Sequence, residues 1–458
     1  MADFETRARK VLPAVLGHYT WLSIERGEGS WLVTTDGRRV LDLTCGIAVT
    51  VVGHSHPRVV KAVVDQAQRL MHISTGVAKY ESSIALAEQL ATITPRGLDS
   101  VFFGNSGAEA VEGAIKLSRQ TTGREAIITF RGGFHGRTVG AATLTTSKSQ
   151  YRRGYGALLP EVYVAPYPYP LGCSLPDAHD AEACARHCFA ELETMLEHEV
   201  PPEHVAAIVI EPVLGEGGYA AAPASFMRSL RELATKIGAL LVFDEVQTGM
   251  GRTGAWFAAQ KFGVTPDILL AAKALGGGMP LGAVIATRER MERWRTGTHG
   301  STFGGNPVSC ASGLATLQVI RDENLVARAE TIGEMMVEEL APLRSHPRLR
   351  EIRRFGAMVA AEFDDKSIAK AAIAAALERD VLLITCGSTT RSFASSPRST
   401  SARPTFVKAC APSSKPRVRL KWPRPPDRCR GRFRSRRLAR CAAVLPDFVP
   451  AILMAPSP

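Results

Sequence analysis

Two patterns of apolar and polar positions alternate along most of the chain. Between about residues 58 and 330, segments with one apolar helical face alternate with short, uninterrupted apolar runs. Apolar runs of this length, rich in Val, Ile and Leu, are typical of strands that are covered on both faces. The pattern therefore predicts an α/β fold with a mainly parallel sheet between helices. Residues 83–93 and 108–120 have the helical pattern, and the apolar runs lie at 100–104, 125–130, 206–213, 239–246 and 281–286.

The two ends of this region have other patterns. Residues 1–60 predict a helix followed by short strands, with a turn at Asp36 and Gly37. Toward the C-terminus, the pattern predicts helical structure, a pair of strands, a second helix and a further strand, and these elements suggest a small α+β domain. They lie at 312–343, 349–363, 367–380 and 381–385.

Composition narrows the class of protein. The chain has 458 residues, 45% of them hydrophobic and 22% charged, which suits a globular protein with two domains. No apolar run approaches the ~20 residues that span a bilayer, and the charged N-terminus predicts no signal peptide. Nine cysteines without a C-x-x-C pair predict reduced thiols and a cytoplasmic location. Cys184 and Cys188 have helical spacing, but no matching pair accompanies them, so we predict no metal site.

The net charge of +12 is confined to one segment. Residues 387–458 contain 16 Lys and Arg against 2 Asp and Glu, which leaves 40 basic and 42 acidic residues in 1–386. This segment also holds 11 of the 28 prolines. The near-neutral remainder offers no electrostatic basis for binding nucleic acid.

A phosphate-binding turn is suggested by "GNSGAEAVEGAIKLSR", residues 104–119. A short apolar run enters a Gly-Asn-Ser-Gly turn, and a helical pattern begins at once. Free backbone N–H groups and the helix dipole favour an anion at such a position. The motif is neither G-x-x-x-x-G-K-[ST] nor G-x-G-x-x-G, which disfavours a nucleotide P-loop. Taken alone, a turn of this kind is more often a simple connection.

Two further apolar runs end in groups that can carry chemistry. Asp244 and Glu245 follow the run 239–243, where α/β folds place ligands. Lys273 follows another run and precedes three glycines, in dry surroundings that favour the neutral amine needed for Schiff-base chemistry. A single lysine is usually a solvated surface residue, so Lys273 is a candidate for this chemistry only in combination with the other motifs. His54 and His56 in "GHSHP" could suggest a metal site, but we expect no carboxylate partner for them and interpret them as part of a turn.

Taken in order, these motifs resemble those of the class III, pyridoxal-phosphate-dependent aminotransferases. The resemblance covers about residues 15–386 and is greatest to 4-aminobutyrate aminotransferases, with acetylornithine and ornithine aminotransferases close. It implies fold type I, with a mainly parallel seven-stranded sheet in a large domain and a small α+β domain built from both chain ends. The implied divisions are 1–57, 58–317, 318–386 and 387–458. The motifs are "FRGGFHGRT", "EPVLGEGG", "DEVQTGMGRTG", Lys273 and "STFGGNP".

The resemblance also implies roles for individual residues. Lys273 would form the internal aldimine with pyridoxal phosphate and move the proton between Cα of the substrate and C4′ of the cofactor. Asp244 would pair with the pyridine nitrogen and keep it protonated. Gln247 would lie by the 3′ oxygen, and Glu211 would have a structural or cofactor-side role.

Further residues would hold the ring and the phosphate. Phe134 would stack on the ring with His135 beside it, while Gly107 and Ala108 would donate backbone N–H groups to the phosphate. Family members often have Ser or Thr where Ala108 stands, so one hydroxyl is absent here. Thr302 would reach the phosphate of the neighbouring subunit, which implies an obligate homodimer.

On the substrate side, Arg137 matches the arginine that binds the distal carboxylate, a task that suits a planar bidentate donor. The alternative for Arg137 is a structural ion pair. Glu216 resembles the glutamate that changes partners between the two half-reactions, and Ile47 would line the pocket. The long insert at 167–212 favours the 4-aminobutyrate branch, so we expect ω-amino acid donors and 2-oxoglutarate as acceptor, in a ping-pong reaction. An acetylornithine or ornithine aminotransferase, or a related racemase, is the alternative.

The segment after Gly387 departs from the family pattern. The family has a strand of the type "xxIVRxxPPLNI" there, whose arginine binds the α-carboxylate of glutamate or 2-oxoglutarate, and then a closing helix. Read two bases downstream, suitable codons for residues 388–401 would give "HDQIVRLIPPLNI". We therefore hypothesise a frameshift near Gly387, in the gene or in its sequencing. The nucleotide sequence decides it, because unsuitable codons there would exclude the idea.

Three interpretations of this segment remain. A sequencing error would leave a working aminotransferase, whereas a real frameshift would give an impaired or inactive chain. The third, a basic nucleic-acid-binding appendage, is disfavoured, because its arginines lack interleaved aromatic residues and its end is uncharged.

Overall fold

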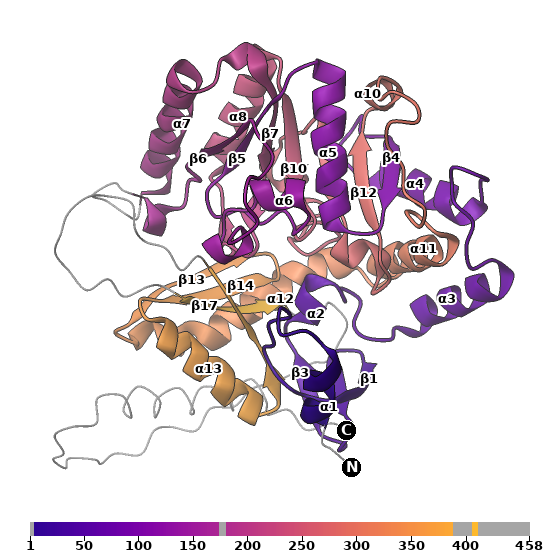
Figure 1. Ribbon diagram of the computed structural model, residues 1–458. Coiled ribbons are helices and arrows are strands. Elements are labelled where there is room, and N and C mark those ends of the chain that lie inside the picture. Colours follow the sequence, from indigo (N-terminus) through magenta and orange to yellow (C-terminus); the bar gives the residue numbers. More distant parts are fainter. Residues whose placement is uncertain (1–3, 174–179, 388–404, 411–458) are drawn as a thin grey trace.

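The computed structural model describes residues 4–173, 180–387 and 405–410. A large sheet lies between helices, and two smaller sheets lie together below it in Figure 1. The helices are α1 Phe4–Val11, α2 Cys45–Ala48, α3 Pro57–Arg69, α4 Glu81–Ile93, α5 Gly107–Thr122, α6 Val139–Leu144, α7 Ala181–His198, α8 Ala224–Ile237, α9 Ala258–Phe262, α10 Arg288–Glu292, α11 Pro307–Asp322, α12 Leu325–Leu340 and α13 Lys366–Glu378.

The large sheet has seven strands in the order β4-β12-β11-β10-β7-β5-β6. Neighbours from β11 through β6 run parallel, and β12 is antiparallel to both β11 and β4. The predicted α/β class with a mainly parallel sheet is therefore confirmed. The strands are β4 Ser100–Gly104, β5 Ala126–Phe130, β6 Val162–Ala165, β7 Val205–Ile210, β10 Leu240–Asp244, β11 Ile268–Ala271 and β12 Gly282–Ala286.

Alternate residues of each central strand face opposite layers of helices, as the two-residue period of a strand requires. In β10, Leu240 and Val242 pack in one apolar cluster with α5 and α6, whereas Leu241 and Phe243 pack in another with α4, α7, α8 and α11. Because both faces are covered, these strands are apolar throughout. This burial explains the uninterrupted apolar runs of the sequence.

The first small sheet joins the two halves of the chain. β1 Ile24–Glu28, β2 Trp31–Thr34 and β3 Arg39–Asp42 form an antiparallel set, and β15 Val381–Leu382 adds to β3 in parallel. The predicted turn lies between β2 and β3, where Gly37 has φ +85° and its N–H donates to the carbonyl of Thr34.

The second small sheet has the order β13-β14-β17-β16, all antiparallel. The pair β13 Leu349–Phe355 and β14 Met358–Phe363 confirms the predicted paired strands. The predicted strand 381–385 is divided: β15 pairs in the first sheet, and β16 Ile384–Cys386 pairs with β17 Thr405–Cys410 in the second. The helical region 312–343 is likewise divided, at Asn324 with φ +51°.

One close contact in this fold gives a stability prediction. Gly333 of α12 lies against the β13–β14 turn, where a Cβ atom would come 1.8 Å from the carbonyl oxygen of Gly356. Gly333→Ala should lower the free energy of unfolding by about 1–3 kcal/mol, as overpacking does. The measurement is urea unfolding followed by circular dichroism.

Gly17→Ala is the matched control, because no atom lies within 4 Å of a Cβ there and its φ needs no glycine. If Gly333→Ala stabilises the chain, as an ordinary helical Gly→Ala change does by about 0.5–1 kcal/mol, the close contact is wrong.

Candidate active site

The site lies at the carboxyl ends of the central parallel strands. Asp244 is the last residue of β10 and pairs in register with Leu270 of β11, and Lys273 follows that strand after Ala272. Parallel neighbours end at the same edge of a sheet, so the acid and the lysine are brought to one side. Lys273 has φ +42°, an uncommon backbone conformation for a residue with a side chain.

A buried ion pair joins the end of β10 to the turn that follows β5. His135 Nδ1 lies 2.7 Å from Asp244 Oδ2, with His135 4% and Asp244 3% exposed. Burial alone would lower the pKa of His135, but the hydrogen bond to Asp244 and its negative charge raise that pKa above its usual value. The structure therefore brings these two predicted residues together as a hydrogen-bonded pair.

Glu211 follows β7 and binds the backbone of the same turn. Its carboxylate accepts hydrogen bonds from the backbone N–H of Phe134 at 2.9 Å and of Gly215 at 3.1 Å. The pKa of Glu211 is raised to about 7, mainly by burial. The negative charge of Asp244 also raises this pKa, and His135 lowers it only in part. Glu211 thus fixes the backbone that presents Phe134 and His135.

Gln247 links the lysine to a glycine-rich loop. Lys273 Nζ donates to Gln247 Oε1 at 3.3 Å, and Gln247 Nε2 donates to the hydroxyl of Tyr219 at 3.1 Å. At Gly215 a Cβ atom would come 2.2 Å from Gln247 Oε1, so only glycine lets this loop approach so closely. The amide of Gln247 is therefore oriented by groups on both sides.

The N-terminus of α5 forms an anion-facing cup. Ser106 caps the helix by accepting from the N–H of Glu109 at 3.2 Å. A Cβ atom at Gly107 would come 2.8 Å from the side chain of Val246, two residues beyond Asp244. Within the described part of the chain, the N–H groups of Gly107 and Ala108 donate to no other group. These two donors point outward along the positive end of the helix dipole.

A second charged group lies beside this cup. Glu216 forms an ion pair with Lys148 and accepts a hydrogen bond from the hydroxyl of Tyr151 at 3.2 Å. The guanidinium of Arg137 lies over the ring of Tyr151, 4.9 Å from its centroid, and the rings of Phe134 and Tyr151 meet edge to face at 5.3 Å. Arg137 is exposed, and among the described residues no carboxylate forms an ion pair with it.

Two predicted residues lie apart from this group. Ile47 is 48% exposed in α2, where four successive residues from Cys45 to Ala48 have positive φ. Cys45 of the same helix packs with Val213 and Tyr219, so the helix borders the loop that contacts Gln247.

Thr302 is exposed in a surface cleft of about 850 Å³ lined by Ser74, Lys79, Phe103 and His299 among others.

The histidines of "GHSHP" each lie beside a carboxylate that is distant in the sequence. His54 Nε2 lies 2.8 Å from Asp42 Oδ2, and His56 Nε2 lies 3.1 Å from Glu323 Oε1. His54 is therefore paired within the first small sheet, and His56 joins the start of α3 to the end of α11.

Sequence reasoning missed Lys148, Tyr151 and Tyr219. Lys148 and Tyr151 lie in "SKSQY", where no spacing or apolar pattern distinguishes them from other loop residues. Tyr219 follows "GEGG", and its place after a glycine-rich turn was a usable signal. The roles of Lys148 and Tyr151 become visible only when their contacts with Glu216 are formed in the fold.

An amine, a buried acid and an anion cup at the strand ends of such a sheet define an enzyme that binds an anionic cofactor through a lysine. Residues 14–397 match the family model "Aminotransferase class-III". The chain therefore belongs to the class III aminotransferases, and the predicted enzyme class, fold type I and pyridoxal phosphate cofactor are confirmed.

Several known proteins are similar to this chain over most of their length. A probable 4-aminobutyrate aminotransferase of Bacillus subtilis is 39% identical over 376 residues, 79% of this chain and 85% of that protein. An acetylornithine aminotransferase of Methanopyrus kandleri is 42% identical over 344 residues, 75% of this chain and 81% of its own. The structure of the ω-transaminase from Pseudomonas jessenii in complex with PMP has a TM-score of 0.83 at 25% identity, and covers 98% of each chain.

The arrangement fits pyridoxal phosphate. The two outward N–H donors of α5 suit its phosphate, and the buried carboxylate of Asp244 suits a protonated ring nitrogen. The turn after β5 packs closely against the cup, since a Cβ atom at Gly136 would come 2.7 Å from that of Ala108. None of the helices in the described segments is long and apolar enough to cross a bilayer.

The neighbour of Asp244 gives a prediction about pH. Glu245 is buried, accepts hydrogen bonds from Thr248 and the N–H groups of Ala258 and Ala259, and burial raises its pKa to about 7. Because the folded-state pKa exceeds the ordinary 4.5, the folded state binds this proton more tightly than the unfolded state. The contribution of Glu245 to stability should therefore fall as pH rises from about 4.5 to 7.

The measurement is urea unfolding of the wild type and Glu245→Gln at several pH values. The stability difference, wild type minus variant, should decrease across this window, and Glu289→Gln on the exposed surface serves as control. A difference that stays constant from pH 5 to 7 contradicts the raised pKa.

Proposed function

We propose that the chain transfers the amino group of an ω-amino acid, with 4-aminobutyrate as the best candidate, to 2-oxoglutarate. The main observation in support of this proposal is the exposed guanidinium of Arg137 beside the cup, on the turn that also holds Phe134 and His135. A planar guanidinium suits a carboxylate at the far end of a short amino acid. Similarity to 4-aminobutyrate aminotransferases at 36–39% identity supports this donor.

Pyridoxal phosphate, when bound, supplies an electron sink for the bonds at Cα of the substrate. The chain's residues hold and move protons around it. Asp244 would hold a proton on the ring nitrogen, and its pairing with His135 keeps the carboxylate oriented. Lys273 Nζ would bind the cofactor and move the proton at Cα, while Gln247, which accepts from Nζ, directs the amine. Phe134 would cover one face of the ring.

Charge balance supports the assignment of the substrate side. Lys148 neutralises Glu216, so the carboxylate of an approaching donor meets the net positive charge of Arg137 instead of a second acid. The burial of Lys148 would lower its pKa, yet the charge of Glu216 raises it, so the ammonium form persists. In the acceptor half-reaction, Glu216 would change partner as a second carboxylate enters the site.

Two further parts of the proposal concern assembly and location. Thr302, exposed in its cleft, would serve the phosphate of a neighbouring subunit in an obligate homodimer. The reduced thiols of the described cysteines suit a cytoplasmic protein.

An acetylornithine donor is the second candidate, favoured by the 42% identity to an archaeal acetylornithine aminotransferase. An inactive chain is the third. The C-terminal segment on which that hypothesis depends lies almost wholly outside the described residues, which include only Gly387 and residues 405–410 of it. Gly387 itself donates its N–H to the carbonyl of Glu216 at 2.6 Å, so the departure from the family sequence begins at the substrate side of the site.

Half-reaction kinetics test the donor. The purified, cofactor-loaded chain should show a visible absorption band that bleaches with 4-aminobutyrate faster than with N-acetylornithine, ornithine or β-alanine at equal concentration. Lys273→Ala should lack the lysine-bound band and transfer amino groups at least about 10²-fold more slowly, the lower range for a lost proton-transfer group. A band in the wild type that no donor bleaches would support the inactive chain, and faster bleaching by N-acetylornithine would reverse the assignment.

Arg137 gives a sharper prediction. Arg137→Ala should lower kcat/KM for 4-aminobutyrate roughly 10- to 100-fold, because a charge-assisted hydrogen bond is worth about 1.5–3 kcal/mol. The rate with n-butylamine, which lacks the carboxylate, should change little. Arg153→Ala on the exposed surface nearby is the matched control. Equal losses with both substrates would show that Arg137 has a structural role.

A further inference from the structure

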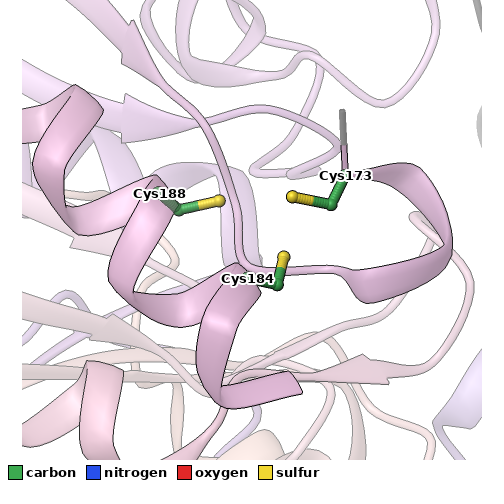
Figure 2. A group of neighbouring side chains, drawn as sticks. All are labelled: Cys173, Cys184 and Cys188. Carbon is green, nitrogen blue, oxygen red and sulfur yellow. The ribbon is translucent and has the colours of Figure 1, made fainter. Parts of the chain in front are cut away.

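Three cysteine side chains that are separated in the sequence converge at one end of α7. Cys184 and Cys188 lie one turn apart on this helix, and Cys173 ends the loop that follows β6. Their sulfur atoms all lie within 4.8 Å of one another, and Figure 2 shows the three thiols directed at a common point. The sequence showed only the helical pair, because Cys173 is eleven residues away in a loop.

The surroundings set this group apart from ordinary core cysteines. Cys184 is 1% and Cys188 3% exposed, in an apolar cluster with Leu192 and Met195, while Cys173 is only half-buried. A hydrogen bond with Cys188, followed by burial, raises the pKa of the Cys184 thiol. The half-exposed Cys173 gives an ion and a water molecule access to the other two.

We propose that Cys173, Cys184 and Cys188 form a binding site for one thiophilic metal ion, Zn²⁺ or Cu⁺. Thiolates are the ligands that both ions prefer, and a metal–sulfur distance of about 2.3 Å requires sulfur atoms somewhat closer than 4.8 Å, which small side-chain rotations supply. Ligands at i and i+4 on a helix share one face, as at other helical metal sites. Solvent at the side of Cys173 would complete the coordination of Zn²⁺.

The binding step balances without any further reactant. One Zn²⁺ replaces the three thiol protons and leaves a tris-thiolate complex with a charge of −1 and three protons in solution. A disulfide would instead need an oxidant and would leave the third thiol unpaired, so the geometry of three converging sulfurs favours the metal.

The site would have a structural role at the base of a functional loop. The loop 166–173 carries Tyr167, whose hydroxyl donates to the carbonyl of Glu211 at 3.3 Å, and Tyr169, which bonds to Glu362 of β14. A metal at Cys173 would fasten the end of this loop to α7. Its removal should therefore lower thermal stability more than it lowers the rate of transamination.

Elemental analysis of the full-length, cofactor-loaded chain tests the proposal. The chain, purified without chelator after growth with added Zn²⁺, should contain about one thiophilic metal ion per chain, and the element found distinguishes Zn²⁺ from Cu⁺. Cd²⁺ added to the chelator-treated protein should give an ultraviolet sulfur-to-metal charge-transfer band that saturates at one equivalent. Chelation should also lower the melting temperature. A wild type that binds neither ion overturns the proposal.

Variants locate the metal. Cys188→Ser should weaken Cd²⁺ binding by at least about tenfold, since even changes in groups that support ligands cost 10- to 100-fold in affinity. It should also remove the effect of chelation on the melting temperature. Cys310→Ser is the matched control, because this thiol is equally buried and donates to the carbonyl of Gly305 away from the cluster. Full binding by Cys188→Ser would place the metal at other cysteines and contradict the site.

Thiol counting separates the disulfide. All nine cysteines should react with a thiol reagent in denaturant after the metal is removed without a reductant. A count of seven would reveal a disulfide in place of the metal site.

Discussion

The burial of one carboxylate, Asp244, is the constraint on which the site depends. A charged acid at the end of a buried strand is costly unless a cation and hydrogen-bond donors surround it. The ring of His135, whose pKa is raised by this acid, lies 2.7 Å away, and the N–H of Val246 supplies a donor at 3.1 Å. His135 can reach Asp244 only if the turn after β5 folds back over β10. The same turn carries Phe134 and Arg137, so satisfying the acid also positions the residues assigned to the ring and the substrate.

A second carboxylate, that of Glu211, connects further loops to this arrangement. Glu211 holds the turn by accepting from Phe134, and it holds the next loop by accepting from Gly215. That loop brings Tyr219 to Gln247, which in turn contacts Lys273. Each carboxylate therefore connects two loops that rise from different strands. A change at any one of them should move several functional side chains together.

The sequence could predict the parts of the site that lie next to strong local patterns. Asp244 and Lys273 each follow an apolar run, and the parallel sheet then requires their strand ends to meet. The cup at Gly107 was visible because a helix pattern begins directly after a glycine-rich turn. Lys148 and Tyr151 could not be found in this way, because their contact with Glu216 depends on how two loops 65 or more residues apart fold onto each other. The division of 381–385 between two sheets was hidden for the same reason: its five residues form one apolar run, but their partners lie in β3 and β17.

The position of Gly387 joins the unusual C-terminal sequence to the chemistry of the site. Its N–H donates to the carbonyl of Glu216, whose side chain pairs with Lys148. Tyr19, near the N-terminus, lies close enough to Glu216 and Lys148 for their charges to act on its hydroxyl. Residues from widely separated parts of the chain therefore meet at the group that would receive the substrate's carboxylates. Arg137 is the exposed cation assigned to one of them, because Lys148 is already paired with Glu216.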